Sequence, residues 1–219
     1  MRKVIICLLV IGLISCRNNK VSQDNSNGYI PAKSNTNKEQ TEESIKEEKI
    51  NNQKIVLSES KIDTFSIPFR EKDMLMDLKN YYKSYSVQAK IGQRDGPDFP
   101  YIDIVKNDGK SIAFFSFDYE NNYKLDEIRI LDSIATDQYG IRVGDSYQKI
   151  IEKRTGDLKN STDHHQHTYL YTENSNIYYE ITGDLTITED MLENLEEFEL
   201  SEKQLQKCTV EYIIWRKRN

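Results

Sequence analysis

The sequence predicts an α+β fold, in which a largely antiparallel sheet of β-hairpins is combined with a few short helices and preceded by a signal peptide and a disordered linker. The hairpins are predicted by turn sequences between apolar runs. The strongest is Asn107-Asp108-Gly109, because Asp-Gly favours a tight hairpin turn. A helix is predicted where Leu75, Leu78 and Tyr82 recur at helical spacing. Sequential hairpins with helices between them favour an antiparallel arrangement.

The remaining elements follow from apolar periodicity and from capping signals. Strands are predicted, in chain order, at residues 62–69, 85–91, 101–105, 111–117, 125–131, 169–171, 177–181 and 209–215. Helices are predicted at residues 71–82, 146–154 and 189–198. A capping box at 201–204 opens a further helical turn, because a serine and a glutamine stand three residues apart there.

The first residues have the pattern of an export signal. Arg2 and Lys3 precede an apolar run over residues 4–14, which is shorter than the roughly 20 residues that a membrane-spanning helix needs. Leu13-Ile14-Ser15-Cys16 resembles the bacterial lipobox, in which the cysteine receives lipid and becomes the first residue of the mature protein. Residues 1–15 are therefore predicted to be a lipoprotein signal peptide. The alternative is an ordinary signal peptide with a chance cysteine at Cys16.

The rest of the chain divides into a tether and a domain. Residues 16–53 comprise the lipidated cysteine and a segment rich in Asn, Ser, Lys and Glu, which has too few apolar residues to offset the entropy of ordering and is predicted to be disordered. Residues 54–219 are predicted to form a single globular α+β domain. By analogy with the enterobacterial sorting rule, Arg17 after the cysteine indicates a bacterial cell envelope location, at the outer membrane rather than the inner one.

Charge and cysteine content exclude some functions. The formal net charge is −6, and residues 1–15 contain only basic charges, so the part that follows is more acidic still. An acidic chain argues against a nucleic-acid partner. Cys208 is the only cysteine beyond Cys16, so no disulfide is expected within the domain, and unpaired cysteines are usually buried.

One segment resembles a known family. Residues 130–147 contain Tyr139-Gly140-Ile141-Arg142-Val143-Gly144-Asp145-Ser146, a strand–loop–helix stretch similar to that of small bacterial envelope lipoproteins with a C-terminal domain of unknown function. The nearest are the enterobacterial RpoE-regulated lipoproteins. The resemblance implies an envelope protein and no particular activity. The two glycines lack the third glycine of a dinucleotide fingerprint and the lysine of a phosphate-binding loop, so they are interpreted as turn residues.

Every histidine lies in one polar loop. His164, His165 and His167 are candidate metal ligands, because neighbouring imidazoles bind zinc, copper or nickel. The competing interpretation is a solvated loop, since no cysteine or further histidine is available from a separate segment. No cofactor is expected.

Tyrosines form the second candidate site. Tyr169 and Tyr171 share one face of a predicted strand, and Tyr179 is expected near them across the hairpin. Tyrosine joins an apolar ring to a polar hydroxyl and is enriched at recognition surfaces. The alternative is that tyrosine simply favours strands.

Together these patterns predict a membrane-anchored bacterial lipoprotein whose domain is not an enzyme and binds a protein partner in the envelope. No nucleophile elbow or Cys/His pair is present, and the acidic residues between 189 and 199 lack the spacing of a calcium loop. One alternative is an inhibitor or immunity lipoprotein against an exported toxin or hydrolase. The other is an enzyme that acts on the cell wall.

Overall fold

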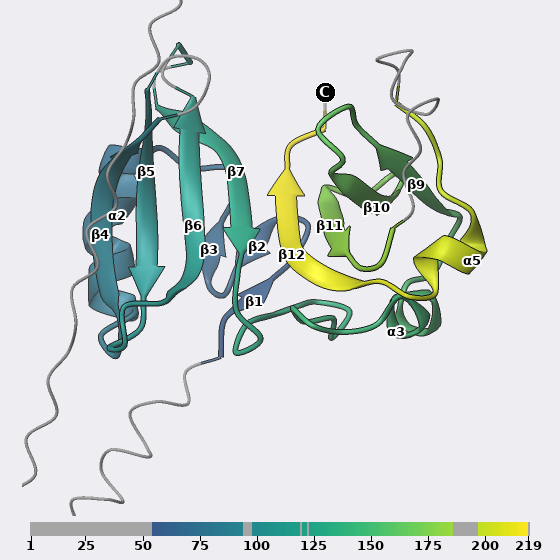
Figure 1. Ribbon diagram of the computed structural model, residues 1–219. Coiled ribbons are helices and arrows are strands. Elements are labelled where there is room, and N and C mark those ends of the chain that lie inside the picture. The colour runs from purple at the N-terminus through teal and green to yellow at the C-terminus, as the bar shows by residue number, and fades with distance from the viewer. Residues whose placement is uncertain (1–53, 94–97, 119, 122, 186–196, 219) are drawn as a thin grey trace, which may run out of the picture.

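An eight-stranded antiparallel sheet dominates the structure. The computed structural model describes residues 54–93, 98–118, 120–121, 123–185 and 197–218 (Figure 1). The strand order is β4-β5-β6-β7-β12-β11-β10-β9, and every neighbouring pair is antiparallel. The strands span Ser86–Gly92 (β4), Phe99–Val105 (β5), Ser111–Asp118 (β6), Lys124–Ile130 (β7), Leu158–Thr162 (β9), Thr168–Thr172 (β10), Ile177–Thr182 (β11) and Thr209–Arg216 (β12).

A small second sheet and short helices complete the described part. The small sheet has the order β3-β2-β1-β8, with β1 and β8 parallel and the other pairs antiparallel. Its strands are Val56–Leu57 (β1), Lys61–Ile62 (β2), Phe65–Ser66 (β3) and Thr136–Asp137 (β8). The described helices are Glu71–Tyr81 (α2), Tyr147–Lys153 (α3) and Glu202–Leu205 (α5). The predicted α+β class with a mostly antiparallel sheet is thus confirmed.

Strand register separates the two faces of the large sheet. Residues Ile102, Phe115, Ile128, Trp215 and Ile177 lie side by side across five strands, and all are buried. The core lies on this side, covered by α2 and the small sheet, which in Figure 1 lie behind the large sheet. The row one residue away, made of Tyr101, Ser116, Glu127 and Arg216, is polar and lies on the opposite face, because side chains alternate between the two faces of a sheet.

Local sequence signals explain the confirmed elements. Gly109 adopts a φ of +85° in the turn between β5 and β6, a conformation that disfavours other residues. Ser146 caps α3, because its Oγ accepts a hydrogen bond from the amide of Lys149 at 3.3 Å. The predicted capping box at Ser201 and Gln204 opens α5. Gly140 and Gly144 have φ values of +81° and +87°, as expected of turn residues.

Some predicted elements differ from those observed, and others lie outside the described residues. Residues 62–69 do not form one strand, because Asp63 turns the chain with a φ of +49° and separates β2 from β3. Strand β9 was not expected, since Leu158–Thr162 shows no apolar alternation. The predicted helix at 189–198 lies outside the described residues except at its end, where Phe198 bridges to Thr162. The predicted signal peptide and tether also lie outside them.

Glu59 ties the small sheet to the large one. Its carboxylate accepts hydrogen bonds from Ser175 Oγ at 2.5 Å and from the amide of Asn176 at 2.6 Å. Its carbonyl accepts from Nε1 of the buried Trp215 at 2.9 Å. Three elements that are far apart in sequence therefore meet at one residue. Within the described residues, no helix has both the length and the apolar character needed to cross a membrane.

Candidate functional site

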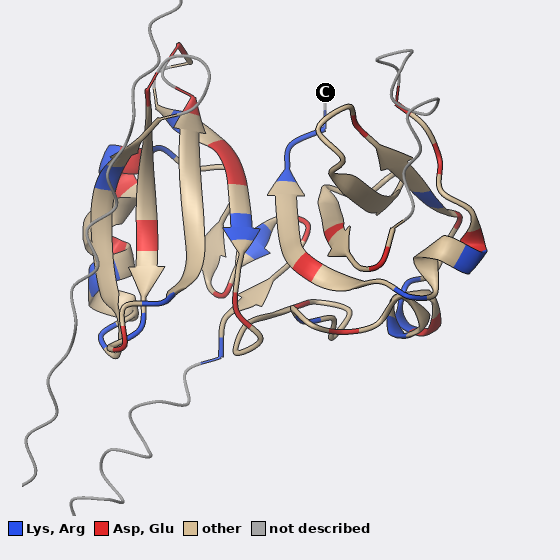
Figure 2. Cartoon of the chain, in the orientation of Figure 1, with Lys and Arg blue, Asp and Glu red and all other residues tan. Residues whose placement is uncertain are grey.

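The side of the large sheet opposite the core carries charged and aromatic side chains, and we call it the polar face. It is defined by Lys90, Tyr101, Asp103, Phe114, Glu127, Arg129, Tyr169, Tyr171, Tyr178, Glu180, Tyr212 and Arg216, which register and side-chain contacts place on one side of the sheet. Acidic and basic positions adjoin along β7 and recur on β12 (Figure 2). A sheet face that alternates aromatic rings with charges is suited to recognition.

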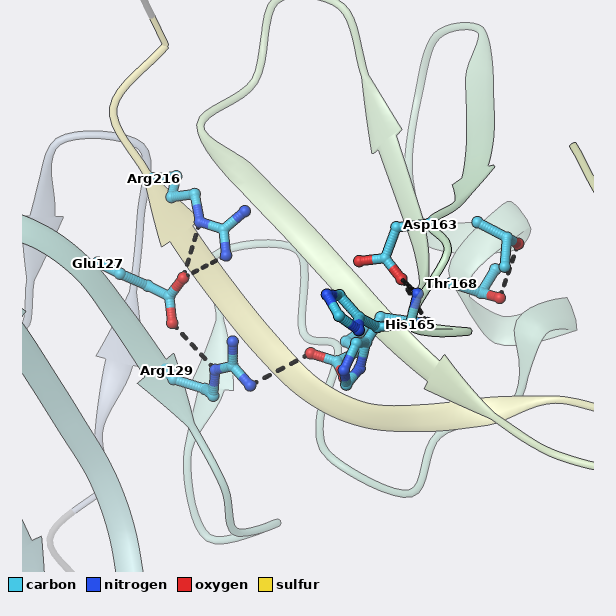
Figure 3. A network of polar contacts seen from close by, with 9 residues as sticks. Glu127, Arg129, Asp163, His165, Thr168 and Arg216 are labelled. Carbon is cyan, nitrogen blue, oxygen red and sulfur yellow. Dashed lines mark hydrogen bonds and ion pairs between the residues drawn. The ribbon is translucent and has the colours of Figure 1, made fainter. Parts of the chain in front are cut away.

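A chain of alternating charges crosses the centre of this face (Figure 3). Arg216 binds Glu127 through Nε at 2.7 Å and Nη2 at 2.6 Å. The other oxygen of Glu127 accepts from Arg129 Nε at 3.0 Å. Arg129 Nη1 lies 3.3 Å from Oε2 of Glu180, as an ion pair outside hydrogen-bond geometry, and Glu180 Oε1 lies 2.6 Å from Nδ1 of His167. The chain therefore connects β12, β7 and β11 with the histidine loop.

The charged side chains of this charge chain neutralise one another where they are shielded from solvent. Glu127 and Glu180 are each only 2% exposed, so either would be costly without its arginine. Burial alone would lower the pKa of Arg216, but the charge of Glu127 and the hydrogen bond to it outweigh burial and raise that pKa. The rings of Phe114 and Tyr212 lie 5.8 and 5.1 Å from the Arg129 guanidinium, so that Arg129 is held by cation–π contacts as well.

At one end of the polar face lies a cleft of about 440 Å³, which we call the Tyr–Arg cleft. It is defined by Tyr169, Tyr171, Tyr178, Arg216 and Arg218, with Ser161, Asp163 and Glu197 at its sides. The Arg216 guanidinium lies 5.9 Å from the Tyr169 ring, and that of Arg218 lies 5.6 Å from the Tyr171 ring. The rings of Tyr171 and Tyr178 are 5.6 Å apart. The cleft thus presents three half-buried aromatic rings beside two cations.

The two arginines of the cleft differ in their partners. Arg216 is paired with Glu127. Arg218 donates to the carbonyl of Thr172 at 3.1 Å, and within the described ranges no carboxylate lies at ion-pair distance from it. Arg218 is therefore the group in this cleft that is best placed to bind an anionic group of a ligand or partner.

The structure brings together two of the three tyrosines of the predicted site, which itself stays a prediction. Tyr169 and Tyr171 lie on the same side of β10, as predicted. The placement of Tyr179 beside them is wrong: Tyr179 pairs with Leu170, is fully buried, and belongs to the core side. Tyr178 takes its place in the cleft.

Tyr179 instead belongs to a buried polar cluster. Its hydroxyl donates to Asp137 Oδ2 at 2.5 Å and accepts from Arg154 Nη1 at 3.1 Å. The Arg154 guanidinium also lies 4.2 Å from the Tyr139 ring and donates to Thr172 Oγ1 at 2.8 Å. These contacts join β8, α3 and the β10–β11 hairpin, so the cluster supports the domain rather than the polar face.

The candidate metal residues point to different neighbours. The rings of His164 and His165 lie 3.9 Å apart, whereas Nδ1 of His167 faces Glu180. Asp163 Oδ1 accepts from the amides of His165 and His167, both at 2.9 Å, and this shapes the loop. In the part of the chain that the structure describes, which includes all three histidines, no three His, Cys, Asp or Glu side chains form a group able to hold a metal ion.

The structure tests one of the two cysteine predictions. Cys208 is 1% exposed, which confirms the prediction of a buried thiol, and burial raises its pKa. Cys16 lies outside the described residues, so its lipidation stays a prediction.

Sequence reasoning missed the charge chain and the Tyr–Arg cleft's arginines. Glu127, Arg129, Glu180 and Arg216 lie on three strands and meet only through register. The one available signal was the alternation of charged and apolar residues along Lys124–Ile130. It predicts a polar side of the strand and says nothing of the partners on that side.

The geometry defines the protein as an α+β domain with one covered and one polar, aromatic sheet face. No family model matches the chain, and no curated protein sequence matches it. Among solved structures, the uncharacterized protein yfeY from Escherichia coli is similar, with a TM-score of 0.51 and 19% sequence identity over 74% of this chain and 99% of that chain. This likeness shows a shared fold with an enterobacterial protein, and it supports the predicted family resemblance as far as the fold alone.

Proposed function

We propose that the chain is an exported bacterial lipoprotein, anchored through lipid on Cys16, whose domain is non-catalytic and binds a protein partner at the cell envelope through the Tyr–Arg cleft. The outer membrane is the proposed location. The observation that carries the binding function is the cleft itself, in which three tyrosines and two arginines converge on one side of the sheet.

The residue types of the cleft support protein recognition. Tyrosine and arginine are enriched among residues that dominate binding energy at protein interfaces, because they bury large areas while keeping directional polar contacts. Tyr169 and Tyr171 are held by neighbouring strands and by the arginines above them. The rings are therefore ordered before a partner binds, which reduces the entropic cost of association. A partner with an exposed carboxylate near apolar side chains would complement Arg218.

The anchor is supported by the order of residues at the start of the chain. Two cations, an apolar run and Leu13-Ile14-Ser15-Cys16 follow one another as in lipoprotein precursors. More than one acyl chain on Cys16 would make membrane attachment stable, since a single chain binds only marginally.

The anchor is tested by comparing the full chain with Cys16→Ser in a bacterial host. We expect the unmodified chain in the membrane fraction, with a mature N-terminus at Cys16 that carries the mass of a diacylglyceryl group. We expect Cys16→Ser to lack that mass and to leave the membrane fraction. An unmodified Cys16, or membrane binding unchanged by Cys16→Ser, would contradict the anchor.

The binding function is tested by affinity capture from envelope extracts with the lipidated protein as bait. The variants are Tyr171→Ala and Arg218→Ala, and the matched control is Tyr123→Ala, an exposed tyrosine outside the cleft. We expect one protein to be retained by the unmodified chain and the control and to be lost with both cleft variants. Equal capture by all baits would contradict the role of the cleft. Digestion of peptidoglycan by the purified protein would contradict a non-catalytic domain.

A further inference from the structure

A second hollow lies on the polar face, over β4, β5 and β6 and away from the Tyr–Arg cleft. Its volume is about 320 Å³, within the range of sites for small ligands. Its lining is mostly apolar and includes the rings of Phe99, Tyr101 and Phe114. The Tyr101 ring centroid lies 5.9 Å from that of Phe99 and 6.0 Å from that of Phe114. The three rings form a continuous aromatic wall.

The shape of this wall is built into β4. Gly92 is the register partner of Phe99, and a Cβ at Gly92 would stand 2.4 Å from Phe99 Cζ. The Phe99 ring therefore rests directly on the glycine backbone. Any larger residue at this position would push the ring away and change the hollow.

A buried carboxylate lies among the rings. Asp103 lines the hollow and is 4% exposed. Its Oδ2 accepts from Lys90 Nζ at 2.6 Å and from Ser111 Oγ at 3.0 Å. Its Oδ1 is fully buried and has no hydrogen-bond partner among the described residues. A buried acceptor without a partner is unfavourable, so the carboxylate has the capacity for a further hydrogen bond from a ligand.

We propose that this hollow binds a neutral pyranose unit of a glycan. The C–H face of a pyranose is weakly positive and apolar, and it complements the negative face of an aromatic ring. Adjacent sugar hydroxyls both donate and accept hydrogen bonds. The Asp103 carboxylate, which lines the hollow, supplies the acceptor, and Lys90 Nζ, which has three donors and is partly exposed, supplies a donor beside it.

The charge at the site favours a neutral ligand over a cation. An aromatic wall with a carboxylate is also the chemistry that binds alkylammonium groups. Here Lys90 already occupies the position of that cation, since its ammonium pairs with Asp103 and lies 6.0 Å from the Tyr101 ring centroid. A second ammonium would have to displace Lys90 or meet its charge. A hydroxyl meets no such opposition.

The test is titration of the full chain, in a detergent without a sugar head group, with trisaccharides of β-1,4-linked glucose and β-1,4-linked N-acetylglucosamine. Calorimetry measures affinity, and saturation-transfer NMR identifies which sugar protons contact the protein. We expect at least one trisaccharide to bind at millimolar concentration or below, with the strongest transfer to the C–H protons of one ring face. Tetramethylammonium and butylammonium serve as the cationic probes and are expected not to bind.

Two variants remove different halves of the site. Asp103→Asn replaces the charged acceptor and is expected to weaken binding about tenfold, the effect of one charged hydrogen bond. Tyr101→Leu keeps an apolar side chain without the ring and is expected to weaken binding severalfold, because the aromatic face for the sugar is lost. Gly92→Ala, which only moves Phe99, is expected to weaken binding as well. The controls are Asp108→Asn in the exposed β5–β6 turn and Tyr171→Ala in the Tyr–Arg cleft, and both should bind as the unmodified chain does.

The result separates this proposal from the function proposed above, because Tyr171→Ala impairs partner capture and leaves sugar binding intact. The absence of trisaccharide binding at millimolar concentration would overturn the proposal. So would binding that is unaffected by both Asp103→Asn and Tyr101→Leu. Binding of the ammonium probes in place of the trisaccharides would assign the hollow to cations instead.

Discussion

The hydroxyl of Tyr179 donates a hydrogen bond to Oδ2 of Asp137 over 2.5 Å, inside the core and on the opposite side of the sheet from Tyr169 and Tyr171. The other oxygen of Asp137 accepts from the amides of Tyr139 and Ile141 at 2.9 and 2.8 Å. One buried carboxylate thus closes the turn after β8 and fixes the β10–β11 hairpin against it.

This arrangement predicts a pH dependence of stability. Burial raises the pKa of Asp137 above its ordinary value of 3.8, although the hydrogen bond from Tyr179 opposes the rise. The folded protein therefore holds the proton more tightly than the unfolded chain. The contribution of Asp137 to the free energy of unfolding is greatest below pH 3.8 and declines as pH rises through the folded-state pKa. We expect the stability of the unmodified chain relative to Asp137→Asn to fall as pH rises, as measured by urea unfolding at several pH values.

Asp132 is the control, because its contribution to stability should change with pH in the opposite direction. Burial alone would raise its pKa, but the hydrogen bonds from Lys106 Nζ at 2.6 Å and from the amide of Ile134, together with the charges of Lys106 and Lys110, outweigh burial and lower the pKa. The contribution of Asp132 is present above the ordinary pKa and is lost as pH falls through the folded-state value. Relative to Asp132→Asn, the unmodified chain should therefore gain stability as pH rises. The same slope for both variants would contradict the assignment.

The hairpins of this fold could be predicted because their signals are local. The turn at Gly109 and the capping box at Ser201 each depend on a few neighbouring residues. Strands β1 and β8 could not be predicted, because two residues are too few to show alternation. Strand β9, with the sequence Leu-Lys-Asn-Ser-Thr, exists because it pairs with β10, and pairing is not visible in its own residues.

The same limit applies to single residues of the candidate site, because the sequence shows spacing within a strand but not the pairing between strands. Tyr169 and Tyr171 could be assigned to one side because residues two apart in a strand share a face. The choice between Tyr178 and Tyr179 required the register of the hairpin, in which Leu170 lies opposite Tyr179. A shift of one residue exchanges the two faces, so the sequence left that choice open.

Arg129 is expected to be the most sensitive position of the charge chain. Replacing it by methionine would leave Glu127 and Glu180 buried with one charge partner fewer. Removing one partner of a buried pair is destabilising by about 3–5 kcal/mol. We expect Arg129→Met to lower the free energy of unfolding by about 3 kcal/mol in urea titrations.

A second substitution distinguishes charge from packing at this position. Adding Glu180→Gln to Arg129→Met should restore part of the loss, since glutamine carries no buried charge. The exposed Arg142→Met serves as the matched control and should change stability by less than about 0.5 kcal/mol. If Glu180→Gln lowers the free energy of unfolding further, the packing of Arg129, rather than its charge, stabilises the charge chain.

Glu59 is expected to matter more than its position in a short loop suggests. Glu59→Ala would leave the amide of Asn176 and the hydroxyl of Ser175 without their acceptor. A buried donor without a partner is unfavourable by about 1–3 kcal/mol, so we expect a loss of about 2 kcal/mol in urea unfolding. Glu59→Gln keeps a side-chain oxygen and should retain most of the stability. The exposed Glu152→Ala is the control. A loss of stability in Glu152→Ala equal to that in Glu59→Ala would refute the role of Glu59 in joining the two sheets.

Cys208 offers a probe of packing at the start of β12. Its thiol is 1% exposed, and burial raises its pKa, so both access and thiolate formation are suppressed in the folded protein. We expect alkylation of the Cys208 peptide, followed by mass spectrometry, to be much slower in the folded chain than in urea.

The backbone of Gly183 leaves no room for a side chain beside Cys208. A Cβ at Gly183 would stand 2.9 Å from the carbonyl oxygen of Lys207 and 3.1 Å from Cα of Cys208, so Gly183→Ala must shift backbone. We expect this variant to accelerate alkylation of Cys208. Gly109→Ala is strained by its φ of +85° but has no neighbour within 4 Å of the added Cβ, so it tests general destabilisation. If Gly109→Ala accelerates alkylation as much as Gly183→Ala does, exposure of Cys208 follows global unfolding; acceleration by Gly183→Ala alone assigns it to local opening where β11 meets β12.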